Sequence, residues 1–348
     1  MKFLRALRTL FVFLLTGILA FLVFLVLVIE VLIHGPSESA RNIFVHSCQE
    51  TSALKFVPRW FLGNAEVDRI LEPAPEEPDE FVALSYDTAG DDFAEADGGE
   101  AGGAAAESAE QAENTEPIVI KDIKGGTYRG KLMIVADPKR VIVGTLKNYG
   151  PGVAGRYLMD FVADYGAVAG TNAGGFDDPE GHGSGGSPDG IVIENGVIRY
   201  GSAGAAYRNV IGIDGEGVLH VGNMSGQQAL DAGIVTGVSF SPGEVLVQNG
   251  IGTENLQSGI NPRTAIGQRA DGAMLLLVVE GRHAGSLGAS YEDLRDIMLD
   301  NGAVTASMLD GGTSSAMVYN GEQITRGSNL IGSRRLPTTI LVMPERAS

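Results

Sequence analysis

A long apolar run near the start of the chain most restricts what this sequence can fold into. From Thr9 to Ile29 the chain has 21 residues without a charged side chain. As an α-helix this run would extend for about 31 Å, close to the roughly 30 Å thickness of the hydrocarbon core of a bilayer. We therefore predict that residues 9–33 associate with a membrane and that residues 1–33 form a basic tip with a transmembrane anchor.

The sequence on either side of this run predicts its orientation. Lys2, Arg5 and Arg8 precede it, so the positive-inside rule places the N-terminus in the cytoplasm and the chain after about residue 34 outside. The following sequence, IEVLIHGPSES, has no convincing small-residue cleavage site, which favours an uncleaved single-pass anchor in the cell membrane. A cleaved signal peptide is the alternative.

An acidic tract carries most of the negative charge of the protein. Residues 72–116 contain 15 Asp or Glu and no Lys or Arg, and without them the net charge of −18 falls to −3. Residues 87–117 consist almost entirely of small and acidic residues, which bury too little apolar surface to offset the entropy of ordering. We predict a disordered linker there. Because the rest of the chain has no basic stripe to neutralise phosphates, we expect no nucleic-acid partner.

The linker separates two parts of different composition. Residues 34–86 have clustered apolar side chains, which predict a membrane-proximal helical stalk or, alternatively, a short helix pair packed on the main domain. Residues 118–348 have short β-branched runs that alternate with turn signals, which is typical of a mixed, strand-rich α/β domain with helices packed on the sheet. Cys48 is the only cysteine, so no intrachain disulfide can form.

Local signals predict individual elements of the main domain. Asn195-Gly196 and Asn320-Gly321 are predicted at the turns of two hairpins. The spacing of apolar residues predicts one helix over residues 154–166 and another over residues 290–302, the second beginning with a capping box.

Two buried strands end in polar residues. Met274–Val279 is an apolar run typical of a central strand, and VTASML at residues 304–309 predicts another strand after the second helix. If the two strands are parallel neighbours, the residues after them share the edge of the sheet at which open α/β sheets bind ligands. These residues are Glu280, Arg282 and Asp310.

Each of these polar residues also has a purely structural interpretation. Asp310-Gly311-Gly312 could be only a tight turn, and Glu280 with Arg282 could form a surface ion pair that contributes little. Arg263, in the sequence NPRTAIG, could cap a helix or anchor a loop.

The sequence supports neither a metal site nor a cofactor. His182, His220 and His283 lack the spacing of zinc ligands, and no phosphate-binding loop of the P-loop type is present. Whether a divalent ion assists is left open; Asp177 or Asp178 would then hold it.

Five short motifs, in this order, resemble the phosphodiester glycosidase family. They are TNAGGF, SPDGIVIENG, NPRTAIG, VVEGR and LDGGTSSAMV. The resemblance covers residues 118–345 and is greatest to membrane-anchored bacterial members described as exopolysaccharide biosynthesis proteins. It implies a glycosidase, similar to N-acetylglucosamine-1-phosphodiester α-N-acetylglucosaminidase, that hydrolyses a sugar-1-phosphodiester at the anomeric carbon in cell-envelope or exopolysaccharide metabolism.

The resemblance also implies which residues form the site. Asp310 would be the nucleophile or the base that activates water, and Glu280 a second catalytic carboxylate, although the family usually has Asp at that position. Arg263 and Arg282 would bind the phosphate by paired hydrogen bonds. The other motif positions would contact substrate: Asn172, Gly174, Gly175, Phe176, Thr264, Gly311, Gly312 and Ser314.

Two other classes of function fit the same residues. A non-catalytic module that binds phosphorylated glycan, or assists exopolysaccharide assembly, would use the arginines and glycines without turnover. A structural envelope protein would use the Asp-Gly-Gly sequence only as a turn. In the first two functions the partner is a phosphorylated glycan or sugar phosphodiester.

Overall fold

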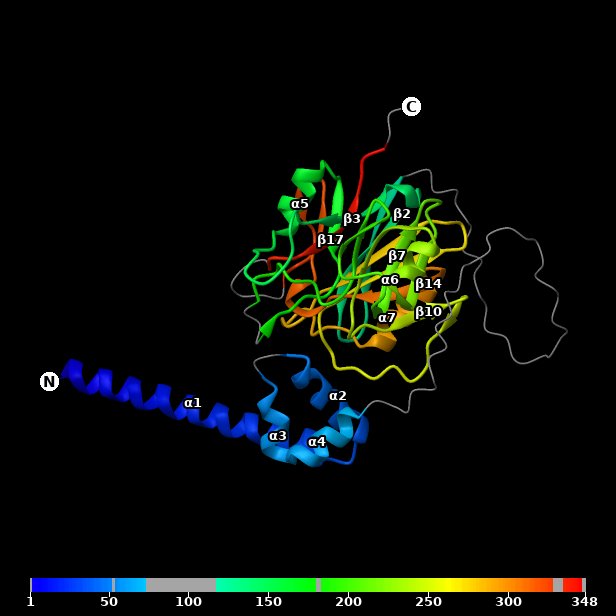
Figure 1. Cartoon of the computed structure of the whole chain (residues 1–348). Helices are drawn as coiled ribbons and strands as arrows, with labels where there is room; N and C mark the ends of the chain where they lie inside the picture. The colour runs from blue at the N-terminus through cyan, green and yellow to red at the C-terminus, as the bar shows by residue number, and fades with distance from the viewer. Residues whose placement is uncertain (1, 52–53, 73–116, 180–182, 328–333, 346–348) are drawn as a thin grey trace, which may run out of the picture. The chain divides into compact units, whose positions relative to one another are not determined.

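The computed structural model describes residues 2–51, 54–72, 117–179, 183–327 and 334–345. The chain divides into two compact units. The first comprises Met1–Glu77 and Gln257–Ile260, and the second comprises Pro78–Leu256 and Asn261–Ser348. Figure 1 shows helices in the first and mostly strands in the second.

The first unit is helical in its described residues. Its helices are α1 (Lys2–His34), α2 (Glu38–Gln49), α3 (Phe56–Leu62) and α4 (Asn64–Leu71). Val45, Val67 and Ile70 form a small core between α2 and α4. The membrane-proximal stalk predicted for residues 34–86 and its alternative, a helix pair packed on the main domain, stay predictions, and residues 73–86 lie outside the described residues. Cys48 is a buried thiol, and burial raises its pKa to about 11.

Helix α1 is long and apolar enough to cross a membrane. The stretch that qualifies is Leu7–His34, and its most apolar window has no buried residue. Length and composition of this kind also fit a signal sequence.

In its described residues the second unit is built from three antiparallel sheets. The seven-stranded sheet has the order β1 (Ile118–Lys124), β2 (Arg129–Val135), β13 (Met274–Val279), β12 (Arg263–Arg269), β14 (Ala303–Leu309), β10 (Val245–Gln248) and β11 (Ile251–Gly252). A five-stranded sheet has the order β16 (Glu322–Gln323), β15 (Met317–Tyr319), β4 (Ala169–Asn172), β17 (Thr338–Val342) and β3 (Val141–Thr145). The other five-stranded sheet has the order β6 (Val197–Tyr200), β5 (Val192–Glu194), β9 (Ile234–Ser239), β7 (Ala206–Asp214) and β8 (Leu219–Ser225).

One hydrophobic core joins the three sheets. Strand β13 contributes six residues without any exposed surface, as expected for the centre of a sheet. Side chains from β3, β4 and β17 of one smaller sheet, and from β7, β8 and β9 of the other, pack into the same core. Helices α5 (Leu158–Tyr165), α6 (Gly226–Asp231) and α7 (Tyr291–Asp300) complete the unit, with α5 lying beside β3 and β17 (Figure 1). The mixed, strand-rich α+β class is confirmed.

The local predictions are confirmed where backbone chemistry decides them. Both residues of Asn195-Gly196 and of Asn320-Gly321 have positive φ, as tight hairpin turns require, and they join β5 to β6 and β15 to β16. Helix α5 ends at Gly166, which has a left-handed φ of 63°. Helix α7 begins with the predicted capping box of Ser290 and Asp293.

One relation between strands differs from the prediction. Strands β13 and β14 run in the same direction, but they are not neighbours, because β12 lies between them and is antiparallel to both. The predicted linker, residues 87–117, lies outside the described residues apart from Pro117. The boundaries proposed for the domains stay predictions.

Candidate active site

Three strand ends bring the predicted site residues to one edge of the seven-stranded sheet. Because β12 is antiparallel to its neighbours, its first residues lie beside the last residues of β13 and β14. Arg263 pairs with Val279, and Thr264 pairs with Leu309. The intervening strand therefore adds its own N-terminal residues to the edge that Glu280, Arg282 and Asp310 were expected to share.

The Asn172 side chain holds the backbone of Asp310 in place by a hydrogen bond. The backbone N–H of Asp310 donates to the carbonyl of Ala173 at 2.9 Å, and the Asn172 amide donates to the Asp310 carbonyl. The Asn172 Oδ1 accepts from the Thr264 hydroxyl at 2.9 Å and from the backbone N–H of Ala316 at 3.2 Å. Asn172 is completely buried. Its side chain therefore holds together the segments that carry the site.

The Asp310 carboxyl group has an unusual affinity for its proton. Burial raises the pKa of Asp310 to about 7. The Ser314 hydroxyl opposes this by hydrogen bonding, the negative charge of Asp189 adds to it, and Arg334 opposes it by its positive charge. Asp310 still retains some exposed surface. A carboxyl group enclosed by protein but reached by solvent is typical of a concave active site.

Asp189 is a second carboxylate at this site, which sequence reasoning did not select. Asp189 is an exposed residue near the end of a glycine-rich segment, residues 171–190, and partial burial of its carboxyl group raises its pKa to about 6. The carboxylate lies against Gly175: a Cβ atom at position 175 would stand 2.3 Å from the Asp189 Oδ2. Its only sequence signal is a carboxylate in the SPDG motif.

Arg282 and Arg263 occupy different environments. Arg282 is exposed, and its Nη2 donates to the Asn261 Oδ1 at 3.0 Å. Its guanidinium lies over Gly312, since a Cβ there would stand 3.6 Å from the Arg282 Nη2. Arg263 is only 5% exposed, donates through Nε to the Ala289 carbonyl at 3.2 Å and packs on the Tyr291 ring at 4.5 Å. Arg282 thus faces outward and Arg263 supports the edge from inside.

The Glu280 carboxylate already has partners on both oxygens. Oε1 accepts the backbone N–H of Arg326 at 2.7 Å, and Oε2 lies 3.3 Å from the His283 Nε2. This arrangement anchors the loops after β13 and β16. A catalytic role for Glu280 stays a prediction.

Arg334 is the second residue that sequence reasoning missed. Its guanidinium forms an ion pair with Asp178 at 2.6 Å and lies 5.4 Å from the centre of the Phe176 ring. Its charge also acts on Asp310. Nothing in its local sequence, SRRLP, distinguishes Arg334 from the neighbouring Arg335.

The remaining predicted residues lie around the same edge. Gly174 donates its N–H to the Thr338 hydroxyl at 3.1 Å, and Gly312 donates to the Pro262 carbonyl at 2.8 Å. A Cβ at Gly311 would stand 3.0 Å from that carbonyl oxygen, so only glycine fits easily. The contact of these residues with substrate stays a prediction.

The described residues provide few potential ligands for a metal ion. Asp178 pairs with Arg334 and accepts the backbone N–H of Gly183 at 2.6 Å. Within the described ranges, no three His, Cys, Asp or Glu residues are grouped so that they could hold an ion. His182 lies outside the described residues.

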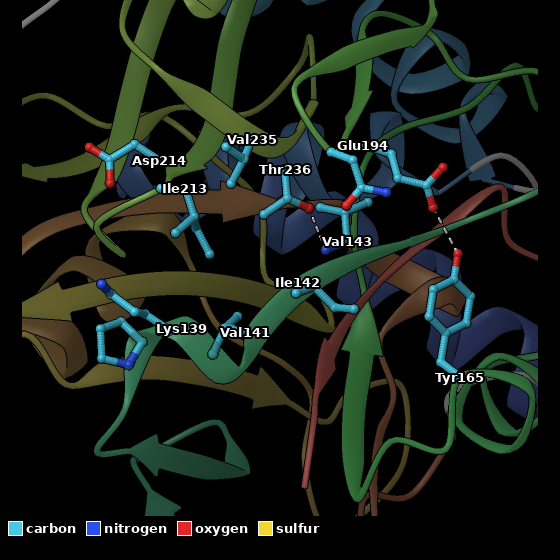
Figure 2. Close-up of a pocket in the computed structure, with 13 residues that line it drawn as sticks. Lys139, Val141, Ile142, Val143, Tyr165, Glu194, Ile213, Asp214, Val235 and Thr236 are labelled. Atoms are coloured by element: carbon cyan, nitrogen blue, oxygen red, sulfur yellow. Dashed lines mark hydrogen bonds between the residues drawn. The ribbon is translucent and has the colours of Figure 1, made fainter. Parts of the chain in front are cut away.

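The second unit has a cavity beside this site and another cavity elsewhere. One, of about 240 Å³, adjoins Asp310 through Ser314 and is also lined by Arg334. The other, of about 260 Å³, lies between β3 and strands β5, β7 and β9, and is shown in Figure 2.

The second cavity has little chemistry to offer. Lys139 and Asp214 lie at one end of it, and Glu194 and Tyr165 lie at the other (Figure 2). Two of its polar groups are bonded to protein: the Tyr165 hydroxyl donates to Glu194 at 3.1 Å, and the Thr236 hydroxyl accepts from a backbone N–H. Its lining includes none of the predicted site residues. The edge around Asp310 is therefore the candidate active site.

The second unit is similar to known proteins. The family model for phosphodiester glycosidases matches residues 165–343, just over half of the chain. The catalytic domain of zebrafish N-acetylglucosamine-1-phosphodiester α-N-acetylglucosaminidase, solved in a form auto-inhibited by its pro-peptide, superposes with a TM-score of 0.53 at 24% identity. That match covers 67% of this chain and 86% of the zebrafish chain, and at this identity it shows the fold alone.

A bacterial relative matches over a shorter region. The SPbeta prophage-derived uncharacterized protein YomE of Bacillus subtilis strain 168 is 35% identical over 85 residues. The match covers 24% of this chain and only 13% of the length of that protein.

Proposed function

Because the chain belongs to the phosphodiester glycosidase family, we propose that it hydrolyses a sugar-1-phosphodiester at the anomeric carbon. The products are a free sugar and a phosphomonoester. The observation that best supports this proposal is that the charges of Asp189 and Arg334 act on the Asp310 carboxyl group, with the Arg282 guanidinium over Gly312 nearby.

Asp310 has the proton affinity that the reaction requires. With a pKa of about 7 it is a stronger base than an ordinary aspartate and is still substantially ionised at neutral pH. It acts as nucleophile at the anomeric carbon or as the base that activates a water. The bond from that carbon to the phosphate oxygen breaks through an oxocarbenium-like state, and the phosphate leaves with the electron pair.

Asp189 supports this step electrostatically. Its negative charge helps to keep the pKa of Asp310 high, and it would stabilise positive charge that develops on the sugar ring. The two groups influence each other, so the observed titration would belong to the pair.

Arg282 is the candidate for binding the phosphate. Its exposed guanidinium lies over Gly312, which is two residues after Asp310 in the chain. A guanidinium can bind two phosphate oxygens at once. A phosphomonoester leaves readily, so positive charge here substitutes for a strong general acid. Arg263, buried beneath, would hold the edge in place and contribute long-range charge.

We further propose that the second unit works outside the cytoplasm on a cell-envelope or exopolysaccharide glycan. This rests on the apolar helix α1 and on the basic residues Lys2, Arg5 and Arg8 before it. A reporter fused after residue 348 that is active only outside the cytoplasm would agree with this orientation. Activity of a cytoplasm-specific reporter at the same position would contradict it.

The experiment that tests the reaction uses the full-length chain in detergent and a panel of glycosyl-1-phosphodiesters in ¹⁸O-labelled water. We expect release of sugar, with the label in the sugar and not in the phosphate, because the carbon–oxygen bond breaks. Asp310→Asn should abolish release, whereas Asp300→Asn, an exposed aspartate at the end of α7, should not. Label in the phosphate, or full activity of Asp310→Asn, would exclude this mechanism. Binding of phosphorylated glycan without turnover would favour the glycan-binding module.

A further inference from the structure

Helix α3 of the first unit exposes two large aromatic side chains. Trp60 is 80% exposed and Phe56 is 51% exposed, and their rings contact each other edge to face with the ring centres 5.3 Å apart. The two residues are four positions apart, so they lie on the same side of the helix. Aromatic rings are normally buried, and a pair this exposed marks a contact with another apolar surface.

Helix α1 limits how far α3 can lie from a bilayer that α1 crosses. The uncharged run of α1 ends at Ile29, and Glu30 and His34, 3.5 Å apart, follow it. Ile33 is only 1% exposed, and α1 packs against α2 and α3. At 1.5 Å per residue, Ile33 lies about 6 Å beyond Ile29, and the headgroup region on each side of the hydrocarbon core is roughly 5–7 Å thick.

The helical unit therefore begins within the headgroup region of such a bilayer. Figure 1 shows α3 at the C-terminal end of α1, where the two helices contact each other. A helix held there by its packing on α1 lies close to the level at which acyl chains meet headgroups. The exposed face of α3 is thus continuous with the apolar surface of α1, whose most apolar window has no buried residue.

The charges of α3 also fit a lipid interface. Its sequence, FVPRWFL, contains no acidic residue. Arg59 forms an ion pair with Asp68 of α4 at 3.0 Å and donates to the Asn64 side chain at 3.2 Å, so its charge is balanced within the unit. Tryptophan is favoured at the interface because its ring is apolar while its N–H stays with hydrated headgroups. The aromatic rings, rather than attraction to anionic lipid, would then stabilise the contact.

We propose that the face of α3 formed by Phe56 and Trp60 lies in the headgroup region of the membrane that α1 crosses. This is a second membrane contact, beyond residues 9–33. It rests on the proposed crossing by α1 and not on the proposed hydrolysis. Two contacts fix the tilt of the helical unit on the bilayer, and the chain that leads to the second unit leaves this unit after Leu71, the end of α4.

The test uses the fluorescence of Trp60, which is the only tryptophan of the chain. The full-length chain is reconstituted in phosphatidylcholine vesicles that carry bromine atoms either near the headgroup end or at the centre of the acyl chains. We expect blue-shifted emission, little quenching by acrylamide, and quenching by the bromines near the headgroups that is roughly twofold stronger than by the central ones. Lipid without net charge should suffice.

Two variants provide the comparison. Trp60→Phe combined with Ile251→Trp moves the tryptophan to a residue of the second unit that is 73% exposed. Its emission should be that of a hydrated indole, quenched by acrylamide and not by bromine. Phe56→Asp puts a carboxylate on the proposed face, so it should shift the Trp60 emission to the red and reduce quenching by bromine by roughly half. Because Phe56 is half exposed, Tm should change by no more than a few degrees.

Four results would overturn the proposal. Acrylamide quenching of Trp60 as strong as at position 251 would show that α3 faces water. Blue-shifted emission that neither quencher affects would show that protein covers α3, as in a helix pair packed on the main domain. Strongest quenching by the central bromines would place α3 deeper than the interface. Equal bromine quenching at positions 60 and 251 would show that the contact is not specific to α3.

Flotation of the vesicles separates this contact from the proposed membrane crossing. A chain that does not float with the vesicles would contradict both the crossing by α1 and the contact of α3. A chain that floats but has a hydrated Trp60 would contradict the contact alone. Hydrolysis of a soluble phosphodiester should be the same in Phe56→Asp and in the wild type, because α3 is not part of the candidate active site.

Discussion

The carboxylate of Asp189 occupies the space where any side chain at Gly175 would begin. A Cβ atom at position 175 would lie 2.3 Å from Oδ2 and 2.8 Å from Oδ1 of Asp189. The Asp189 backbone N–H also donates to the Gly175 carbonyl at 3.1 Å. Gly175 and Asp189, two residues of the glycine-rich segment, thus pack together and place the Asp189 carboxylate near Asp310.

Gly175→Ala should therefore impair catalysis by moving the Asp189 carboxylate. The added methyl must displace the Asp189 carboxylate, which removes its negative charge from the neighbourhood of Asp310. We expect kcat/KM to fall by roughly tenfold or more, with the apparent pKa of the basic group in the pH–rate profile shifted downward. Gly126→Ala is the matched control, because a Cβ there has open space. An unchanged pH–rate profile in Gly175→Ala would separate Asp189 from the reaction.

The pKa of Asp310 predicts an unusual dependence of stability on pH. An acid whose pKa is raised in the folded state binds more protons folded than unfolded between about pH 4 and 7, so the free energy of unfolding falls as pH rises through this window. Asp310→Asn removes that cost. We expect the variant to be more stable than the wild type at pH 8, by up to a few kcal/mol, and the difference to vanish near pH 3. Denaturant unfolding at several pH values would measure it; a variant less stable at pH 8 would contradict it.

Much of the fold could be predicted because its signals are local. The Asn-Gly turns, the capping box before α7 and the glycine that ends α5 each depend on residues within one turn of the chain. The parallel direction of β13 and β14 also followed from their strand–helix–strand order. The insertion of β12 between them could not be predicted, because it depends on backbone pairing between segments distant in the sequence.

The site shows the same limit. Asp310 and Arg282 could be selected because Asp310 directly follows β14 and Arg282 lies three residues after the end of β13. Asp189 and Arg334 lie on loops, and only the folded chain brings their charges to Asp310. The burial of Asn172 and Arg263 could not be predicted from the sequence either. A motif indicates that a residue is important, but it does not tell whether that residue contacts substrate or supports another residue that does.

Asn172 should be the residue whose loss costs most stability at this edge. Asn172→Ala would leave the Thr264 hydroxyl, the Ala316 N–H and the Asp310 carbonyl without their partner. We expect a loss of roughly 2–4 kcal/mol in the free energy of unfolding, together with loss of activity. Asn172→Asp retains the acceptor but cannot donate to the Asp310 carbonyl, so it should also be destabilised. Wild-type stability in both variants would show that the Asp310 backbone is held by other contacts.

Arg282 offers a way to separate binding from folding at a single position. Its φ of 61° lies in the left-handed region, which is strained for arginine and easy for glycine. Arg282→Gly should therefore keep or raise Tm while it removes the guanidinium and reduces kcat/KM by roughly a hundredfold or more. Arg282→Lys keeps the charge but loses the two-pronged geometry, and we expect an intermediate loss. Arg199→Lys, at an exposed arginine paired with Glu194, is the control and should have wild-type kinetics. If Arg282→Gly unfolds at a markedly lower temperature, the arginine stabilises the loop; if it keeps wild-type kinetics, the phosphate binds elsewhere.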